Sequence, residues 1–193
     1  PADAVLIAGD LFDHDRVSRD TAAFLRESFE GIAPIPVFIA PGNHDPYVIG
    51  SPYATEDWPA NVHIFNRPFW TSYALENLPL TVHGFAFDGP DISANPFGTL
   101  AAPDDDRIHV AVAHGSERGS QPPGKMSYAP FTAQAAAVPG LRYLALGHFH
   151  DVKRITGDFE TVMYYSGAPE GHDFGETGPR HYLEVEIEDT GNV

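Results

Sequence analysis

The sequence of 193 residues contains no cysteine, and this absence excludes several kinds of site at once. A disulfide framework, a zinc site built on thiolates and a cysteine nucleophile are all ruled out. No stretch approaches the roughly 18 uninterrupted apolar residues of a membrane-spanning helix, and the first residues do not resemble a secretory signal. We therefore expect a cytoplasmic protein without membrane contact, in which any metal ion is held by histidine, aspartate, glutamate or asparagine.

Positive charge is also scarce. The chain has 11 lysine and arginine residues against 27 aspartate and glutamate residues, and its formal net charge is −16. This balance opposes the broad electrostatic attraction that drives non-specific DNA binding. A polyanionic partner would need a local basic stripe or bound cations.

The sequence does contain enough apolar residues, 42%, to build one core of ordinary size. Residues 4–8 and 36–40 are predicted to be buried strands, and the helix between them is capped by Ser18 and stopped by Gly31 and Pro34. This arrangement predicts a βαβ unit with parallel strands. Further elements are predicted as strands over 80–87, 108–113, 143–146, 152–155, 161–165 and 181–187 and a short helix over 131–138.

Four of the predicted strands end in residues that could bind a metal ion. In open α/β sheets, ligands bind beyond the carboxyl ends of the strands, so these side chains are predicted to converge at one rim. In chain order the candidates are Asp10, then Asn43 with His44 and Asp45, then His114, then His148 with His150.

The residue types at this rim suit hydrolytic metal chemistry. A carboxylate can bridge two cations, an asparagine oxygen is a weak neutral ligand, and neutral imidazoles suit manganese, iron or zinc. Two cations about 3.5 to 4 Å apart can neutralise the attacking and leaving oxygens of a phosphate ester. Each motif alone is more typical of a turn, a helix cap or a packed histidine than of a metal ligand. The occurrence of all four, each after a buried run, favours a metallophosphoesterase site.

These motifs resemble a known family. The successive motifs of calcineurin-like metallophosphoesterases are similar to Gly9-Asp10-Leu11-Phe12-Asp13, Gly42-Asn43-His44-Asp45, His114 and Gly147-His148-Phe149-His150. Within the superfamily the sequence most resembles SbcD-type and YhaO-type DNA repair exonucleases, through residues 114–116, 128–131, 145–148, 165–171 and 174–180. The resemblance implies an α/β fold with a two-sheet β core flanked by helices, forming one domain over residues 1–193.

The resemblance also implies which residue binds which of two metal ions. Asp10 would bridge two divalent ions, for which manganese is favoured over iron or zinc. The second ion would be completed by Asn43, His114 and His148, and His150 would contribute to the first.

The implied catalytic residues lie in the second motif. His44 would sit beside the scissile phosphate, with Asp45 orienting its ring. Asp13 could support the metal site or bond only to its own loop. Arg118 and Lys125, in the loop after His114, could touch DNA phosphates, and His172 with Asp173 could shape the substrate cleft.

One family feature is missing, because no histidine in this chain has an aspartate two positions before it. The Asp-x-His pair that would end an earlier strand is therefore absent. We expect a fragment that lacks the first strand and a later capping region, leaving only Asp10 and His150 for the first ion.

Three functions remain open from the sequence. The first is a metal-dependent phosphodiesterase, specifically a DNA exonuclease subunit of a repair complex. The second is a phosphodiesterase or phosphatase for small nucleotides or phosphoproteins, although Asp45 disfavours the phosphoprotein version. The third is a non-catalytic scaffold that docks an ATPase. The resemblance implies an SMC-like ATPase partner, and a homodimer is compatible with it.

Overall fold

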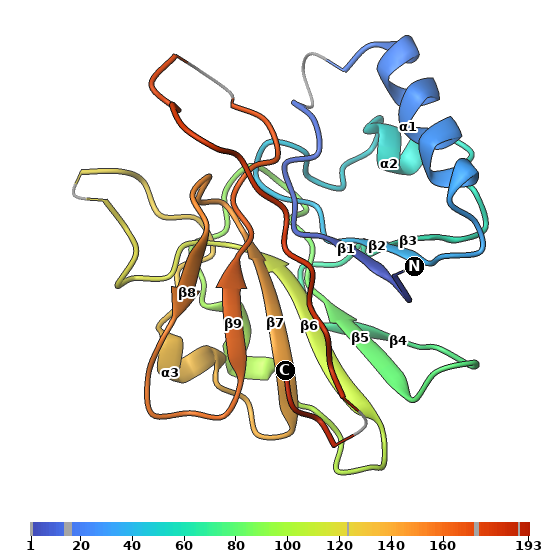
Figure 1. Ribbon diagram of the computed structural model, residues 1–193. Coiled ribbons are helices and arrows are strands. Elements are labelled where there is room, and N and C mark those ends of the chain that lie inside the picture. The colour runs from blue at the N-terminus through green and yellow to red at the C-terminus, as the bar shows by residue number, and fades with distance from the viewer. Residues whose placement is uncertain (1, 14–16, 123, 172–173, 189) are drawn as a thin grey trace.

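The computed structural model describes residues 2–13, 17–122, 124–171, 174–188 and 190–193, which form two β-sheets with a few short helices (Figure 1). The smaller sheet is parallel, in the order β1 (Val5–Ile7), β2 (Val37–Ile39) and β3 (Val62–Ile64). The larger sheet has the order β4-β5-β6-β7-β9-β8, and only its two edge strands run antiparallel to their neighbours. Its strands are β4 (Thr71–Ala74), β5 (Leu80–Gly84), β6 (Ile108–His114), β7 (Leu141–Gly147), β8 (Lys153–Ile155) and β9 (Val162–Tyr165).

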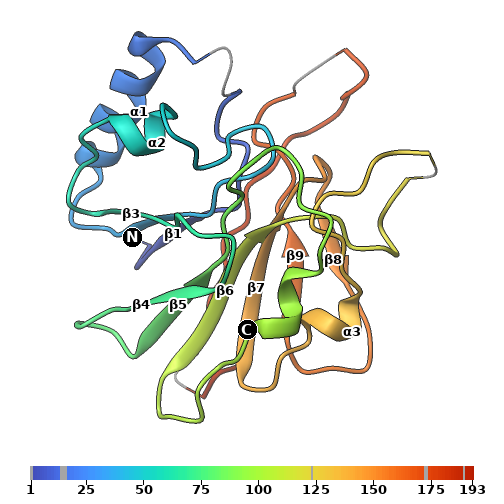
Figure 2. The same ribbon diagram turned by 180° about the vertical axis from the view of Figure 1, so that it is seen from behind.

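The helices cover the outer faces of the two sheets (Figures 1 and 2). Helix α1 (Arg19–Gly31) begins after Ser18, whose hydroxyl accepts a hydrogen bond from the Thr21 backbone N–H at 3.0 Å. Helices α1 and α2 (Pro52–Thr55) lie over the smaller sheet. The 3₁₀ turn η1 (Pro96–Thr99) and helix α3 (Ala133–Ala136) pack against the larger one. Among the described residues, no helix combines the length and apolar character needed to cross a bilayer.

An apolar layer between the sheets fixes their relative position. Phe38 and Phe65 from the smaller-sheet side pack against Val82, Val110 and Val112 of the larger sheet, and all five are buried. Burying a side chain of this size stabilises a fold by roughly 1.5 to 3 kcal/mol. The layer therefore holds the carboxyl ends of β1 and β2 beside those of β6 and β7.

The two-sheet α/β architecture predicted from the sequence is confirmed. The βαβ unit and the predicted strands up to residue 165 are present, with slightly different bounds, and the helix predicted over 131–138 is confined to α3. Strands β3 and β4 were not predicted.

The strand predicted over residues 181–187 is wrong, because this segment lies across the face of the larger sheet instead of joining its ladder (Figure 1). Leu183 and Ile187 are half-buried, whereas the intervening Glu184 and Glu186 are exposed. Alternating apolar and acidic residues thus partly cover one side of the segment, although Val185 between them stays exposed, without requiring a neighbouring strand.

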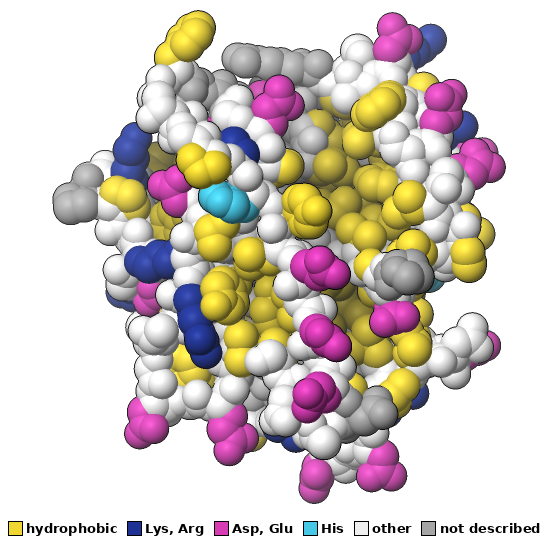
Figure 3. Space-filling view, in the orientation of Figure 1, with side chains coloured by type: hydrophobic (Ala, Val, Ile, Leu, Met, Phe, Trp, Pro, Cys, Tyr) yellow, Lys and Arg dark blue, Asp and Glu magenta, His cyan; other side chains and the backbone are white. Residues whose placement is uncertain are grey.

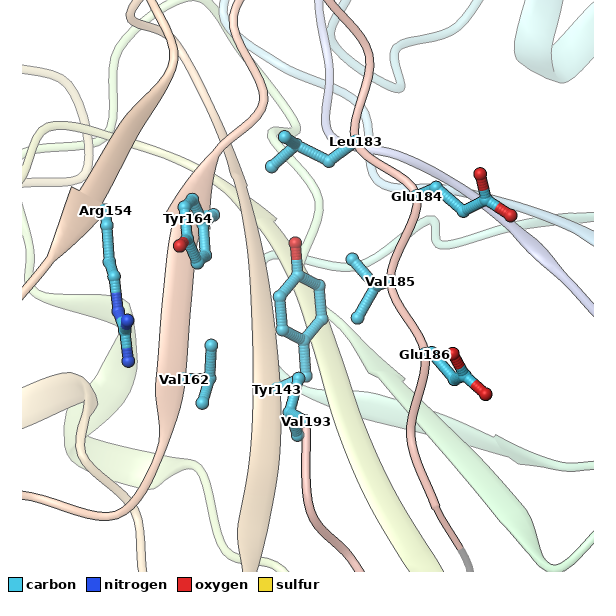
Figure 4. A pocket seen from close by; sticks show the side chains of 9 residues that line it. All are labelled: Tyr143, Arg154, Val162, Tyr164, Leu183, Glu184, Val185, Glu186 and Val193. Atoms are coloured by element: carbon cyan, nitrogen blue, oxygen red, sulfur yellow. The ribbon is translucent and has the colours of Figure 1, made fainter.

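A cavity of about 250 Å³ lies between this segment and the sheet (Figure 4). Tyr143, Val162 and Tyr164 line it from the sheet, and Leu183 and Val185 line it from the segment. None of its lining residues is a candidate metal ligand. The candidate site must therefore be sought at the strand ends.

The larger sheet also carries a buried histidine pair whose protonation should affect stability. His83 Nε2 lies 2.8 Å from His109 Nδ1, and His109 Nε2 lies 3.0 Å from Asp105 Oδ1. Burial, reinforced by the neighbouring His109 and opposed by Asp105, lowers the pKa of His83 to about 4. Between pH 4 and 6.5 the unfolded chain therefore binds more protons at this position than the folded protein does.

Stability is accordingly expected to fall as the pH drops from 6.5 to 4, by about 2 kcal/mol from His83, with no further loss from this group below pH 4. Urea unfolding of the protein and of His83→Gln at pH 7 and pH 4.5 measures the effect. The variant should lose less stability on acidification. An equal loss in both proteins would contradict the assignment.

Candidate metal centre

Three candidate ligands meet where the two sheets adjoin. His114 ends β6, whereas Asp10 and Asn43 lie in the loops after β1 and β2. His114 Nε2 lies 2.9 Å from Asn43 Oδ1 and 3.3 Å from Asp10 Oδ2. The structure therefore brings together one carboxylate, one amide and one imidazole, contributed by three different strand ends, as the sequence predicted.

The hydrogen bonding of His114 indicates that a cation fits between these groups. Its Nδ1 lies 2.9 Å from the Ala8 carbonyl oxygen, which can only accept a hydrogen bond, so Nδ1 carries the proton. In the tautomer that carries its proton only on Nδ1, the lone pair of Nε2 faces the oxygens of Asn43 and Asp10. Three electron-pair donors pointing at one another repel unless a positive charge lies among them. Within the described parts of the chain no three histidine or carboxylate side chains form such a group, and the amide completes this one.

His148 lies beside this group, with its ring centroid 5.3 Å from that of His114. Burial, followed by the nearby His114, lowers the pKa of His148 to about 4. The ring is therefore neutral at physiological pH, which is the form that ligates metals.

The backbone around these ligands adopts conformations that non-glycine residues seldom adopt. Asp10 has φ 54° and His148 has φ 118°. Strain of this kind persists only where the surrounding structure enforces it, and it is concentrated at functional sites. Its presence at two candidate ligands supports a functional role for this rim.

Glycines allow the ligand loops to approach this closely. A Cβ atom on Gly147 would overlap the Ala8 carbonyl oxygen, and one on Gly42 would overlap the Asp10 carboxylate. Gly42 and Gly147 therefore allow the loops to come this close together, because neither has a side chain.

Asp45 lies beneath the loops and is completely buried. Its carboxylate accepts hydrogen bonds from the backbone N–H groups of Asp10 (2.9 Å), Leu11 (2.8 Å) and Gly42 (2.6 Å) and from the Tyr53 hydroxyl (2.6 Å). Burial raises its pKa to about 6, against the opposing effect of the Tyr53 hydrogen bond. Asp45 thus remains ionised at neutral pH and ties the first two motifs together.

The hydrogen bonds correct the role that the sequence suggested for Asp45. Its carboxylate accepts hydrogen bonds from these inward-lying donors, whereas the His44 ring Nδ1 lies 3.1 Å from Asp13 Oδ1. Asp13, from the loop after Asp10, therefore orients the ring. The His44 backbone N–H donates to Asp10 Oδ1 at 3.0 Å, and its side chain is 56% exposed at the rim.

Comparison with known proteins agrees with this geometry. A model of the calcineurin-like phosphoesterase family matches residues 1–152, which is more than half of the chain. This chain belongs to that family. It is also 31% identical over 190 residues to "Uncharacterized metallophosphoesterase YhaO" of Bacillus subtilis (strain 168), a match that covers 96% of this chain and 45% of that protein. This metallophosphoesterase thus spans less than half the length of that relative.

The last predicted ligand of this metallophosphoesterase, His150, occupies a more open position. Its Nδ1 pairs with Glu176 Oε1. Glu176 was not singled out from the sequence as a site residue, because 26 residues separate it from His150. The predicted cleft residues His172 and Asp173 lie outside the described residues.

Basic residues lie on one side of the metallophosphoesterase. Lys153 and Arg154 begin β8, just after His150, and both are exposed, as are Arg118 and Lys125 in the loop after His114. Arg154 also lies over the Tyr164 ring, 5.8 Å from its centroid. Within the part of the chain that the structure describes, none of these four forms an ion pair. We call Arg118, Lys125, Lys153 and Arg154 the basic strip.

Proposed function

We propose that this metallophosphoesterase hydrolyses phosphodiester bonds of DNA with divalent cations, manganese being the expected metal, as part of a repair exonuclease. The main support for the proposal is that the oxygens of Asp10 and Asn43 lie close to His114 Nε2, in an arrangement that a bound cation would stabilise. Bound cations there would supply charge neutralisation and an activated water. The family membership supports phosphoester hydrolysis, and the choice of DNA rests on the subgroup resemblance of the sequence and on the basic strip.

His44 is the residue best placed to assist the leaving group. Its exposed ring stands at the rim, while the Asp10 carboxylate holds its backbone and Asp13 faces Nδ1. The Asp13 carboxylate at Nδ1 orients the ring and leaves Nε2 to face the substrate. Donation of a proton from Nε2 to the leaving oxygen is the step we assign to His44.

The basic strip offers a path for a polyanion on an otherwise acidic protein. In both ribbon views the 115–128 loop and β8 occupy the same side of the molecule (Figures 1 and 2). Lys and Arg side chains also gather along that side in the space-filling view (Figure 3). Phosphate contacts of this type position a duplex without reading its sequence.

Hydrolysis of three substrates measured side by side with Mn²⁺ tests the proposal. These are duplex DNA, a cyclic nucleotide and a generic aryl phosphodiester. Preferential hydrolysis of DNA supports the proposal, and preferential hydrolysis of the cyclic nucleotide would replace it with a small-nucleotide phosphodiesterase. No hydrolysis of any of them would favour a scaffold.

Reversing charge in the basic strip should weaken DNA hydrolysis selectively. The double variant Lys153→Glu/Arg154→Glu is expected to raise KM for duplex DNA about tenfold and to flatten the slope of log affinity against log salt by about 2, because two phosphate contacts are lost. Hydrolysis of the aryl phosphodiester should not change. The matched control is Arg19→Glu/Arg142→Glu, which alters net charge equally at exposed positions on α1 and at the start of β7. Equal effects of the two double variants would contradict a local DNA path.

The assembly of the whole protein is also part of the proposal. Because the chain covers 45% of the YhaO relative, a longer protein could carry further functional parts. The SMC-like ATPase partner and the homodimer rest on the subgroup resemblance alone, and the cytoplasmic location rests on the sequence features described above. Co-purification of a tagged full-length protein with an ATPase from its own cells tests the first of these.

A further inference from the structure

The segment 174–180, which carries part of the subgroup resemblance, folds back onto the metal rim. Its Glu176 pairs through Oε1 with Nδ1 of His150. The Glu176 side chain is 20% exposed, although the segment itself is largely exposed. This acidic side chain is therefore turned inward, toward a predicted metal ligand.

Arg180 fixes the Glu176 carboxylate from its other side. Its Nη1 lies 3.5 Å from Glu176 Oε2 and donates to the His150 carbonyl oxygen at 3.3 Å, while Nη2 donates to the Thr177 carbonyl oxygen at 3.3 Å. Its side chain is 14% exposed. One arginine thus joins the carboxylate, its own loop and the backbone of the histidine.

This arrangement differs from an ordinary surface ion pair. Isolated exposed pairs contribute little, because water screens them and long side chains lose entropy. Here the carboxylate is held by two partners, and both acidic and basic side chains are mostly covered. These contacts determine how the His150 ring is oriented.

We infer that Glu176, clamped by Arg180, is a positioning residue that fixes the tautomer and orientation of His150 for metal binding. A carboxylate at Nδ1 keeps the ring proton there and leaves the lone pair on Nε2. Carboxylate–histidine pairs of this kind orient metal ligands and raise their basicity. The inference rests on the proposed metal centre, and it assigns a function to the 174–180 motif that the sequence alone left unexplained.

The tautomer of His150 tests the inference without any metal. Long-range ¹H–¹⁵N NMR at pH 8, with the His150 signals identified by their loss in His150→Gln, should show the proton on Nδ1 in the unaltered protein. Glu176→Ala should shift the proton to Nε2, the site that free imidazole side chains prefer. Glu176→Gln, which keeps an acceptor oxygen, should lie between them. Glu170→Ala is the matched control, because it removes an exposed glutamate of the same region.

Manganese binding supplies the second measurement. The Mn²⁺ concentration that broadens the His150 signals should rise 10- to 100-fold in Glu176→Ala and remain unchanged in Glu170→Ala. An unchanged tautomer in Glu176→Ala would overturn the inference, as would a changed tautomer with unchanged manganese binding. If both shifts occur but DNA is not hydrolysed, the role of Glu176 is supported and the proposed substrate is wrong.

Discussion

Replacing His44 with alanine is expected to slow hydrolysis by 10²- to 10⁴-fold while leaving metal content unchanged, because the role we propose for the ring is to donate a proton and not to hold a cation. The imidazole is exposed at the rim, and its Nδ1 faces Asp13. Steady-state rates on DNA, together with metal analysis of the dialysed protein, measure both effects. Asp13→Asn should produce a smaller loss of rate, since the amide oxygen can still accept from Nδ1 and orient the ring.

The contrasting variant is His148→Ala. The His148 ring is partly buried beside His114, so its removal should lower metal content itself and reduce turnover as a consequence. Excess Mn²⁺ should restore part of the activity of His148→Ala and none of that lost in His44→Ala. The reverse pattern, with metal lost from the His44 variant and retained in the His148 variant, would overturn the assigned roles.

The convergence of the ligands could be predicted from the sequence because it follows from strand polarity. Asp10 and Asn43 come directly after short buried strands, and His114 ends one. Parallel strands of one sheet present their carboxyl ends at the same edge. This rule covers Asp10 and Asn43, which follow strands of the smaller sheet. Their approach to His114 of the larger sheet depends on the apolar layer between the sheets, which strand polarity alone does not determine.

The partners of the ligands could not be predicted in the same way. The family resemblance implied that Asp45 orients the His44 ring. Its carboxylate instead accepts hydrogen bonds from four inward-lying donors, and Asp13 lies at the ring. Which of two nearby carboxylates reaches a histidine depends on loop conformation. Glu176 was missed for a related reason, because its contact with His150 arises from the path of a long loop.

Segment 181–187 shows the limit of periodicity arguments. Its alternation of apolar and acidic residues correctly indicates an extended chain with one buried side. Alternation does not specify whether the backbone pairs with a strand or the side chains lie on a sheet face. That choice depends on the apolar face presented by Tyr143, Val162 and Tyr164, which is assembled from two other strands.

Replacing Asp45 with alanine is expected to have the largest effect on stability, about 4 kcal/mol. Three backbone N–H groups, that of buried Gly42 and those of the partly buried Asp10 and Leu11, would lose their acceptor together with the Tyr53 hydroxyl. Each unsatisfied buried donor costs about 1 to 3 kcal/mol, and water entering the space left by the carboxylate would offset part of the sum. Urea unfolding at pH 7 measures the change.

Tyr53→Phe is the matched control, because it removes one donor and leaves the carboxylate in place. Its expected cost is about 1 kcal/mol, with metal binding unchanged. Asp45→Ala should in addition weaken metal binding, since the loop that carries Asp10 would no longer be tied to the loop that carries Asn43. If Asp45→Ala unfolded at the same urea concentration as Tyr53→Phe and bound metal normally, the two loops would be held together by contacts other than this carboxylate. The expected combination of lost stability and weakened metal binding follows because one buried side chain links the first two ligand loops.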